Sequence, residues 1–111
     1  AIARARARTA QTQREVGAWI FKNPDGSYSV GPMMDGSYGL PNCPPSTHCM
    51  PLMATAPSGA VAAFHTHPQF PLPSGADAQN ARYNRVYSYV VSPNTIYALS
   101  PSGTVLWQSN R

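Results

Sequence analysis

The apolar positions of the chain fall into short runs separated by turn residues, a pattern typical of strands in a small sheet. The first run is residues 15–22, EVGAWIFK, and the turn signal Asn23-Pro24-Asp25-Gly26 follows it. We therefore expect a hairpin whose returning strand is 27–30. Before it, residues 2–13 lack helix breakers and are rich in Ala, Arg and Gln, which predicts a helix.

The second half of the chain predicts a strand, a helix and a three-strand meander. The small apolar run 60–66, AVAAFHT, is a buried strand, and residues 75–84, GADAQNARYN, form a short helix. The meander strands are expected at 86–91, 95–99 and 104–108. The fold class is therefore α+β, with a mixed, mostly antiparallel sheet flanked by the two helices.

Residues 31–58 show no clear periodicity and contain many of the prolines and both cysteines. An irregular segment of this length is unusual in a compact domain and is often functional. A substrate-facing loop and an insertion without a role remain equally open. We expect residues 1–111 to form a single domain that carries this segment as an insertion.

Composition supports short strands and ordered loops. Of the 111 residues, only 11% are charged, whereas Pro and Gly number 12 and 8. The net charge is +4, and Arg4, Arg6, Arg8 and Arg14 supply half of the eight basic residues. Such a basic arm can contact nucleic acid or an acidic partner, but it has no interleaved aromatic residues, so a solvated helix start or linker is favoured.

No apolar run reaches the roughly 18 residues of a membrane span, so none is expected. The first residue is Ala, and the chain opens in the middle of a helical pattern. These features predict a piece of a longer protein.

The two cysteines, Cys43 and Cys49, are separated by five residues. They could close a small disulfide loop, which would suit a secreted or periplasmic protein, or remain free thiols. With His48 they could instead form a metal cluster. That set offers three ligands at a spacing that matches no familiar zinc motif, so disulfide or thiols are favoured.

The stretch 62–81, AAFHTHPQFPLPSGADAQNA, contains the strongest candidate chemistry. On a strand, His65 and His67 lie two residues apart and point to the same face, so both can bind one metal ion. Pro68 then ends the strand. Taken alone, the pair fits two hydrogen-bonded surface histidines equally well.

Ser74 and Asp77 have two compatible interpretations. They resemble a capping box at the start of the predicted helix, although Glu or Gln is usual at the third helical position. Asp77 could also be a third metal ligand, with Ser74 as a polar helper beside it.

Among the four acidic residues, Asp25 and Asp35 each precede a glycine and are explained by turns. Glu15, the single glutamate, has no such explanation. It stands at the entry to the first apolar strand, where an ion pair with Arg14 or another arginine of the arm is the alternative to a role in chemistry.

Together, Glu15, His65-Thr66-His67-Pro68 and Ser74-Gly75-Ala76-Asp77 resemble the JAMM (JAB/MPN) metallopeptidase signature. The resemblance implies a JAB/MPN-like (cytidine-deaminase-like) fold and a catalytic Zn²⁺ held by His65, His67 and Asp77. It further implies that Glu15 transfers the proton of the attacking water and that Ser74 hydrogen-bonds the developing oxyanion. Six residues separate His67 from Ser74, one fewer than is usual in that family.

The phrases 15–30 and 89–103 look like the bacterial branch of such domains, found at the C-termini of Rhs-type polymorphic toxins. That likeness implies a protein or peptide substrate, an upstream carrier polypeptide, a cognate immunity protein, and secretion or delivery into a target cell. Two alternatives remain. One is a metal-dependent nuclease or other nucleic-acid-directed toxin, although the H-x-E…P-C-x-x-C pattern of deaminases is not present. The other is a catalytically inactive binding module.

Overall fold

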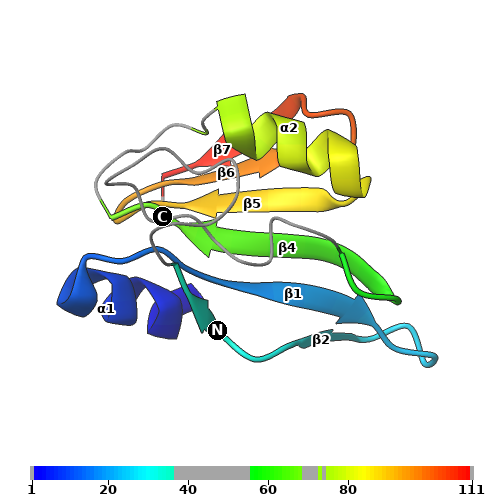
Figure 1. The fold of residues 1–111 in the computed structure, drawn as a ribbon, viewed down its shortest axis with the longest axis horizontal. Helices are drawn as coiled ribbons and strands as arrows, with labels where there is room; N and C mark the ends of the chain where they lie inside the picture. Colours follow the sequence, from blue (N-terminus) through cyan, green and yellow to red (C-terminus); the bar gives the residue numbers. More distant parts are fainter. Residues whose placement is uncertain (1, 37–55, 69–72, 74, 111) are drawn as a thin grey trace.

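The computed structural model describes residues 2–36, 56–68, 73 and 75–110 (Figure 1). Two helices and seven strands are formed within these ranges. In chain order they are α1 (Ile2–Thr12), β1 (Val16–Lys22), β2 (Tyr28–Val30), β3 (Met34–Asp35), β4 (Ala60–Thr66), α2 (Gly75–Asn84), β5 (Tyr87–Val91), β6 (Ile96–Leu99) and β7 (Val105–Ser109).

All seven strands join one sheet in the order β2-β1-β4-β5-β6-β7, with β3 paired to β1 beside β2. β4 and β5 run parallel, and α2 makes the crossover between them; the other neighbours are antiparallel. The expected α+β class is confirmed, with a mixed, mostly antiparallel sheet, an N-terminal helix and a short helix after the histidines.

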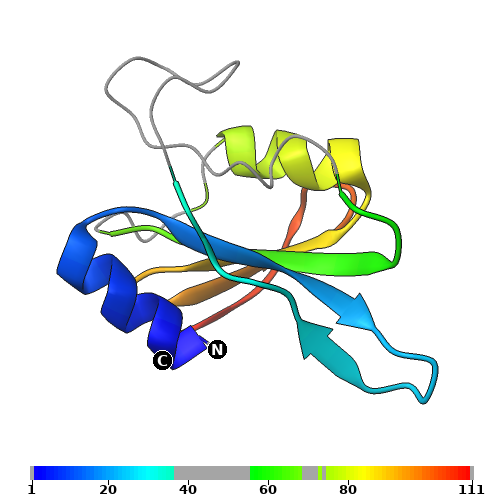
Figure 2. The same ribbon diagram turned by 60° about the horizontal axis from the view of Figure 1, so that its bottom comes forward.

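The two helices cover opposite faces of the sheet (Figure 2). Under α1, Ala5 packs with Val16 and Phe64, all of them at most 2% exposed. On the other face, Trp19 packs with Ala63, the residue next to Phe64. Successive residues of a strand point to opposite faces of the sheet, so these short strands have an apolar face on each side.

The N-terminal helix is a packed element. Ala5 and Thr9, one helical turn apart, are both buried against the sheet. Arg6 donates from Nε to the carbonyl of Ser92, and Arg8 forms an ion pair with Asp35. Ala5 and Thr9 therefore pack one face of α1 onto the sheet, whereas Arg4, Arg8 and Arg14 remain exposed, so the expected arm is a helix with one buried and one solvated face.

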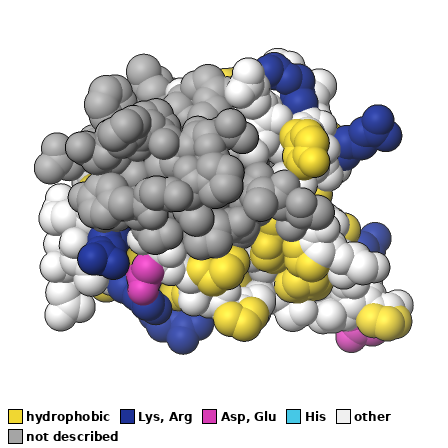
Figure 3. Space-filling model, viewed as in Figure 1, with side chains coloured by type: hydrophobic (Ala, Val, Ile, Leu, Met, Phe, Trp, Pro, Cys, Tyr) yellow, Lys and Arg dark blue, Asp and Glu magenta, His cyan; other side chains and the backbone are white. Residues whose placement is uncertain are grey.

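The turn assignments of the two aspartates had different outcomes. Asp25 accepts hydrogen bonds from the N–H and hydroxyl of Ser27, as a turn aspartate does. Asp35, in contrast, lies in β3, opposite Val16. Figure 3 shows an acidic side chain among basic ones on this face of the molecule. A two-residue strand is too short to produce a hydrophobic pattern, so β3 was not expected within 31–58.

No helix among the described ranges is long and apolar enough to span a membrane.

Candidate metal centre

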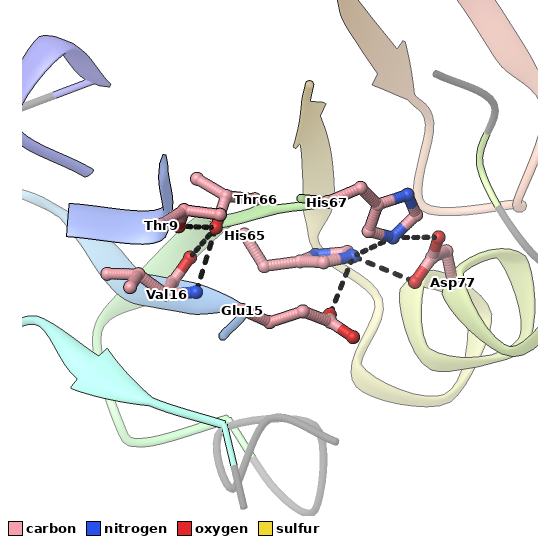
Figure 4. Close-up of polar contacts among 7 residues, drawn as sticks. All are labelled: Thr9, Glu15, Val16, His65, Thr66, His67 and Asp77. Carbon is pink, nitrogen blue, oxygen red and sulfur yellow. Dashed lines mark hydrogen bonds and ion pairs between the residues drawn. The ribbon is translucent and has the colours of Figure 1, made fainter. Parts of the chain in front are cut away.

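Three elements bring the candidate site together. Glu15 directly precedes β1, His65 lies in β4 with His67 one residue beyond its end, and Asp77 lies in the first turn of α2. Gly17 pairs with His65, so Glu15 enters the sheet on the face that α2 covers. Figure 4 shows the four side chains converging on one point.

The distances between the converging atoms are short. The Nε2 atoms of His65 and His67 lie 3.1 Å apart, and the two oxygens of Asp77 lie 2.9 Å and 3.3 Å from them, one oxygen to each ring. Glu15 Oε1 is more distant, 3.9 Å from Nε2 of His65. The ligand atoms of Glu15, His65 and His67 all lie within 4.8 Å of one another.

The donor set fits a divalent metal ion. Two nitrogens that each lie about 2.0–2.1 Å from a tetrahedral zinc ion are separated by roughly 3.4 Å, close to the spacing of the two histidines. Both rings are buried, at 0% and 9% exposure, and Asp77 is 7% exposed. Buried groups of this kind are stabilised when they are paired or bind a metal, and two nitrogens with one carboxylate are a donor set that zinc accepts.

Without a metal, the same groups stabilise one another by charge. Burial opposes ionisation of Asp77, but the charges and hydrogen bonds of His65 and His67 outweigh it and hold the pKa of Asp77 well below its usual range. Burial likewise lowers the pKa of His65, and the charge and hydrogen bond of Asp77, with the charge of Glu15, raise it above its ordinary value. The site therefore favours a positive charge next to the ionised carboxylate of Asp77.

Glu15 differs from Asp77 in both position and charge balance. Its side chain is 21% exposed, so it remains accessible from solvent. Burial is the largest influence and raises the pKa of Glu15, and the neighbouring histidines oppose this shift. A carboxylate with a raised pKa next to a metal site has the properties of a group that accepts and returns protons.

The structure brings together four of the five residues that the sequence singled out. His65 and His67 point to the same face, as their spacing predicted. Within the described ranges, Glu15 pairs with His65 and forms no ion pair with an arginine. Ser74 lies outside the described residues, and so do Cys43, His48 and Cys49, together with their possible disulfide or metal cluster.

Two buried threonines were not singled out by sequence. Thr66, between the two histidines, is 1% exposed and accepts a hydrogen bond from the N–H of Val16. Its hydroxyl also meets that of Thr9, from α1. The spacing of Thr9 from Ala5 places it on the buried face of the helix, which is the one signal that could have identified it.

The fold and the site define a JAB-type α+β domain with a candidate divalent-metal centre. A family model described as prokaryotic homologs of the JAB domain matches residues 2–108, and the chain belongs to this family. Searches of curated proteins and of solved structures gave no match.

Proposed function

We propose that this domain is a zinc-dependent hydrolase of the JAMM type that cleaves a peptide or isopeptide bond. The observation that carries the proposal is the convergence of His65, His67 and Asp77, with Glu15 beside them on the more exposed side. Three protein ligands are the number that catalytic zinc sites use.

When bound, a zinc ion would supply Lewis acidity toward the scissile carbonyl and would lower the pKa of a water molecule. His65, His67 and Asp77, all of them buried, would hold the ion. Glu15 takes the proton of the attacking water and passes it to the leaving nitrogen. Ser74 donates a hydrogen bond to the developing oxyanion, a role that rests on the resemblance alone.

We further propose that the domain acts as the toxin part of a larger secreted or delivered bacterial protein, with a carrier upstream and a cognate immunity protein. This part of the proposal rests on the likeness of residues 15–30 and 89–103 to Rhs-type toxin domains.

The nucleic-acid alternative receives less support from the surroundings of the arginines. Arg6 is bonded to the carbonyls of Ser92 and Thr95, and Arg8 is paired with Asp35. These contacts partly neutralise the positive charge that would attract phosphates. Incubating the pure domain with plasmid DNA and RNA tests this alternative directly.

The decisive experiment combines metal content with the phenotype of two variants in a bacterial host that expresses the domain. The parent should bind one zinc ion per chain and inhibit growth. Glu15→Gln should retain the zinc and lose the inhibition, because it keeps the ligands and removes the proton acceptor. His67→Ala should lose both.

A matched control is Asp25→Asn, which removes a carboxylate from an exposed turn. Asp25 has no role in the proposed reaction. The variant should behave as the parent does. An active Glu15→Gln variant would exclude Glu15 as the base, and a parent that binds no divalent ion in metal-replete buffer would favour the inactive binding module.

A further inference from the structure

A buried hydroxyl pair links α1 to β4, on the sheet face opposite the one that His65 occupies. The pair consists of Thr9 and Thr66, whose Oγ1 atoms are in hydrogen-bond contact (Figure 4). Thr9 is 4% exposed and Thr66 is 1% exposed. Buried polar groups normally form hydrogen bonds, and here the two hydroxyls are partners for each other.

The hydroxyl of Thr66 replaces a backbone bond between β1 and β4. The paired register of the two strands ends with Gly17 opposite His65, one residue before Val16 and Thr66 would pair. There, Thr66 Oγ1 accepts from the N–H of Val16 at 2.8 Å and lies 3.3 Å from the carbonyl of the same residue. A side chain thus fixes the first residue of β1.

Glu15 is the residue directly before this contact. On its other side, its carbonyl accepts from the N–H of Gly36 at 2.7 Å. The backbone around Glu15 is therefore held from both directions, by Thr66 through Val16 and by Gly36. Its carboxylate reaches to 3.9 Å from Nε2 of His65.

We infer that Thr66, supported by Thr9, is a positioning residue that holds Glu15 at the metal site. His65 and His67 lie on either side of Thr66. The same short segment therefore supplies two of the proposed ligands and, through the hydroxyl of Thr66, fixes the distance from Glu15 to His65. Thr9 places α1 in the same network. The inference rests on the proposed function for its chemical meaning, but the position of Glu15 can be measured without any substrate.

The test compares Thr66→Val, which keeps the shape and removes the hydroxyl, with Thr66→Ser, which keeps the hydroxyl. In crystals of the metal-free proteins, the parent and Thr66→Ser should keep Glu15 Oε1 near 3.9 Å from His65 Nε2. In Thr66→Val, Glu15 should move away from His65 while the two histidines and Asp77 stay in place. An unchanged Glu15 in Thr66→Val would overturn the inference.

A solution measurement uses the fact that Glu15 is the single glutamate of the chain. Glutamate labelled with ¹³C at the side-chain carboxylate gives one resonance. Bound Co²⁺ should broaden it strongly in the parent and in Thr66→Ser. In Thr66→Val, most of this broadening should be lost although the variant still binds one Co²⁺ per chain; full broadening would overturn the inference.

The remaining outcomes are also decisive. If Thr66→Val does not fold, Thr9→Val takes its place. This variant keeps Thr66 Oγ1 as the acceptor for the N–H of Val16 and removes only the hydrogen bond from the hydroxyl of Thr9. A displaced Glu15 then supports the inference, and an unmoved one overturns it. If the parent binds no Co²⁺ or Zn²⁺, the proposed function fails, and the metal-free crystals alone decide the positioning role.

Discussion

Glu15 shows at the scale of one residue how a site side chain can destabilise the fold that carries it. Burial raises the pKa of Glu15 above the ordinary value of 4.5, so the folded state penalises the ionised form. The unfolded chain therefore ionises first as the pH rises, and stability is lost between the unfolded and the folded pKa. The loss grows as the pH rises through this window, whereas in acid the group is neutral in both states.

We therefore predict that Glu15→Gln melts at a higher temperature than the parent at pH 7, with both proteins kept metal-free by a chelator. The difference should shrink as the pH falls through the range in which glutamate is protonated. Thermal unfolding followed by circular dichroism from about pH 3 to pH 7 measures it.

Asp25→Asn is the control with the opposite sign. Hydrogen bonds from Ser27 lower the pKa of Asp25, so its contribution to stability is present above the unfolded pKa and lost in acid. Its replacement should lower the melting temperature slightly at pH 7. If Glu15→Gln is no more stable than the parent at any pH, burial does not raise the pKa of Glu15 in the folded protein.

At the scale of elements, the position of α2 depends on a glycine in the turn before β7. Gly103 has φ of +83°, and a Cβ atom there would lie 2.9 Å from the carbonyl of Ala78 and 3.0 Å from the guanidinium of Arg82. Ala78 follows Asp77, so a shift of this backbone would reach the proposed metal ligand.

We predict that Gly103→Ala is destabilised by the positive φ and, in addition, by the contact with α2. The conformational part is about 1–2 kcal/mol. Gly26→Ala isolates that part, because Gly26 has φ of +89° and nothing within 4 Å of the added Cβ. Urea unfolding of both variants should give the larger loss for Gly103→Ala. Equal losses would mean that α2 moves aside without cost.

The elements that the sequence predicted best are those with a local signal. The strand at 60–66 and the helix at 75–84 lie where they were expected, because apolar run length and breakers define them locally. β3 and the packing of α1 were missed because both depend on partners far along the chain. The proximity of Glu15 to His65 follows from the register of β1 with β4, and only the resemblance to a known signature suggested it.

At the scale of the whole molecule, the candidate site joins the two layers that α2 and the sheet form. His65 lies in β4, His67 directly follows it, and Asp77 lies in α2. A bound ion would connect them only in the folded state, because the unfolded chain does not keep the three side chains together. Metal binding is then part of the stability of the domain.

We therefore predict that zinc raises the melting temperature of the parent and that a chelator reverses the rise. At free zinc 100-fold above its dissociation constant, the gain is about 2.7 kcal/mol, provided that zinc does not bind the unfolded chain. For a domain of this size, that corresponds to roughly 10 °C. Differential scanning calorimetry with zinc and with chelator measures the difference. His67→Ala should show no response to either addition, whereas Glu15→Gln should respond as the parent does, because it retains all three ligands. A parent whose melting temperature is the same in zinc and in chelator would contradict a metal site that spans β4 and α2.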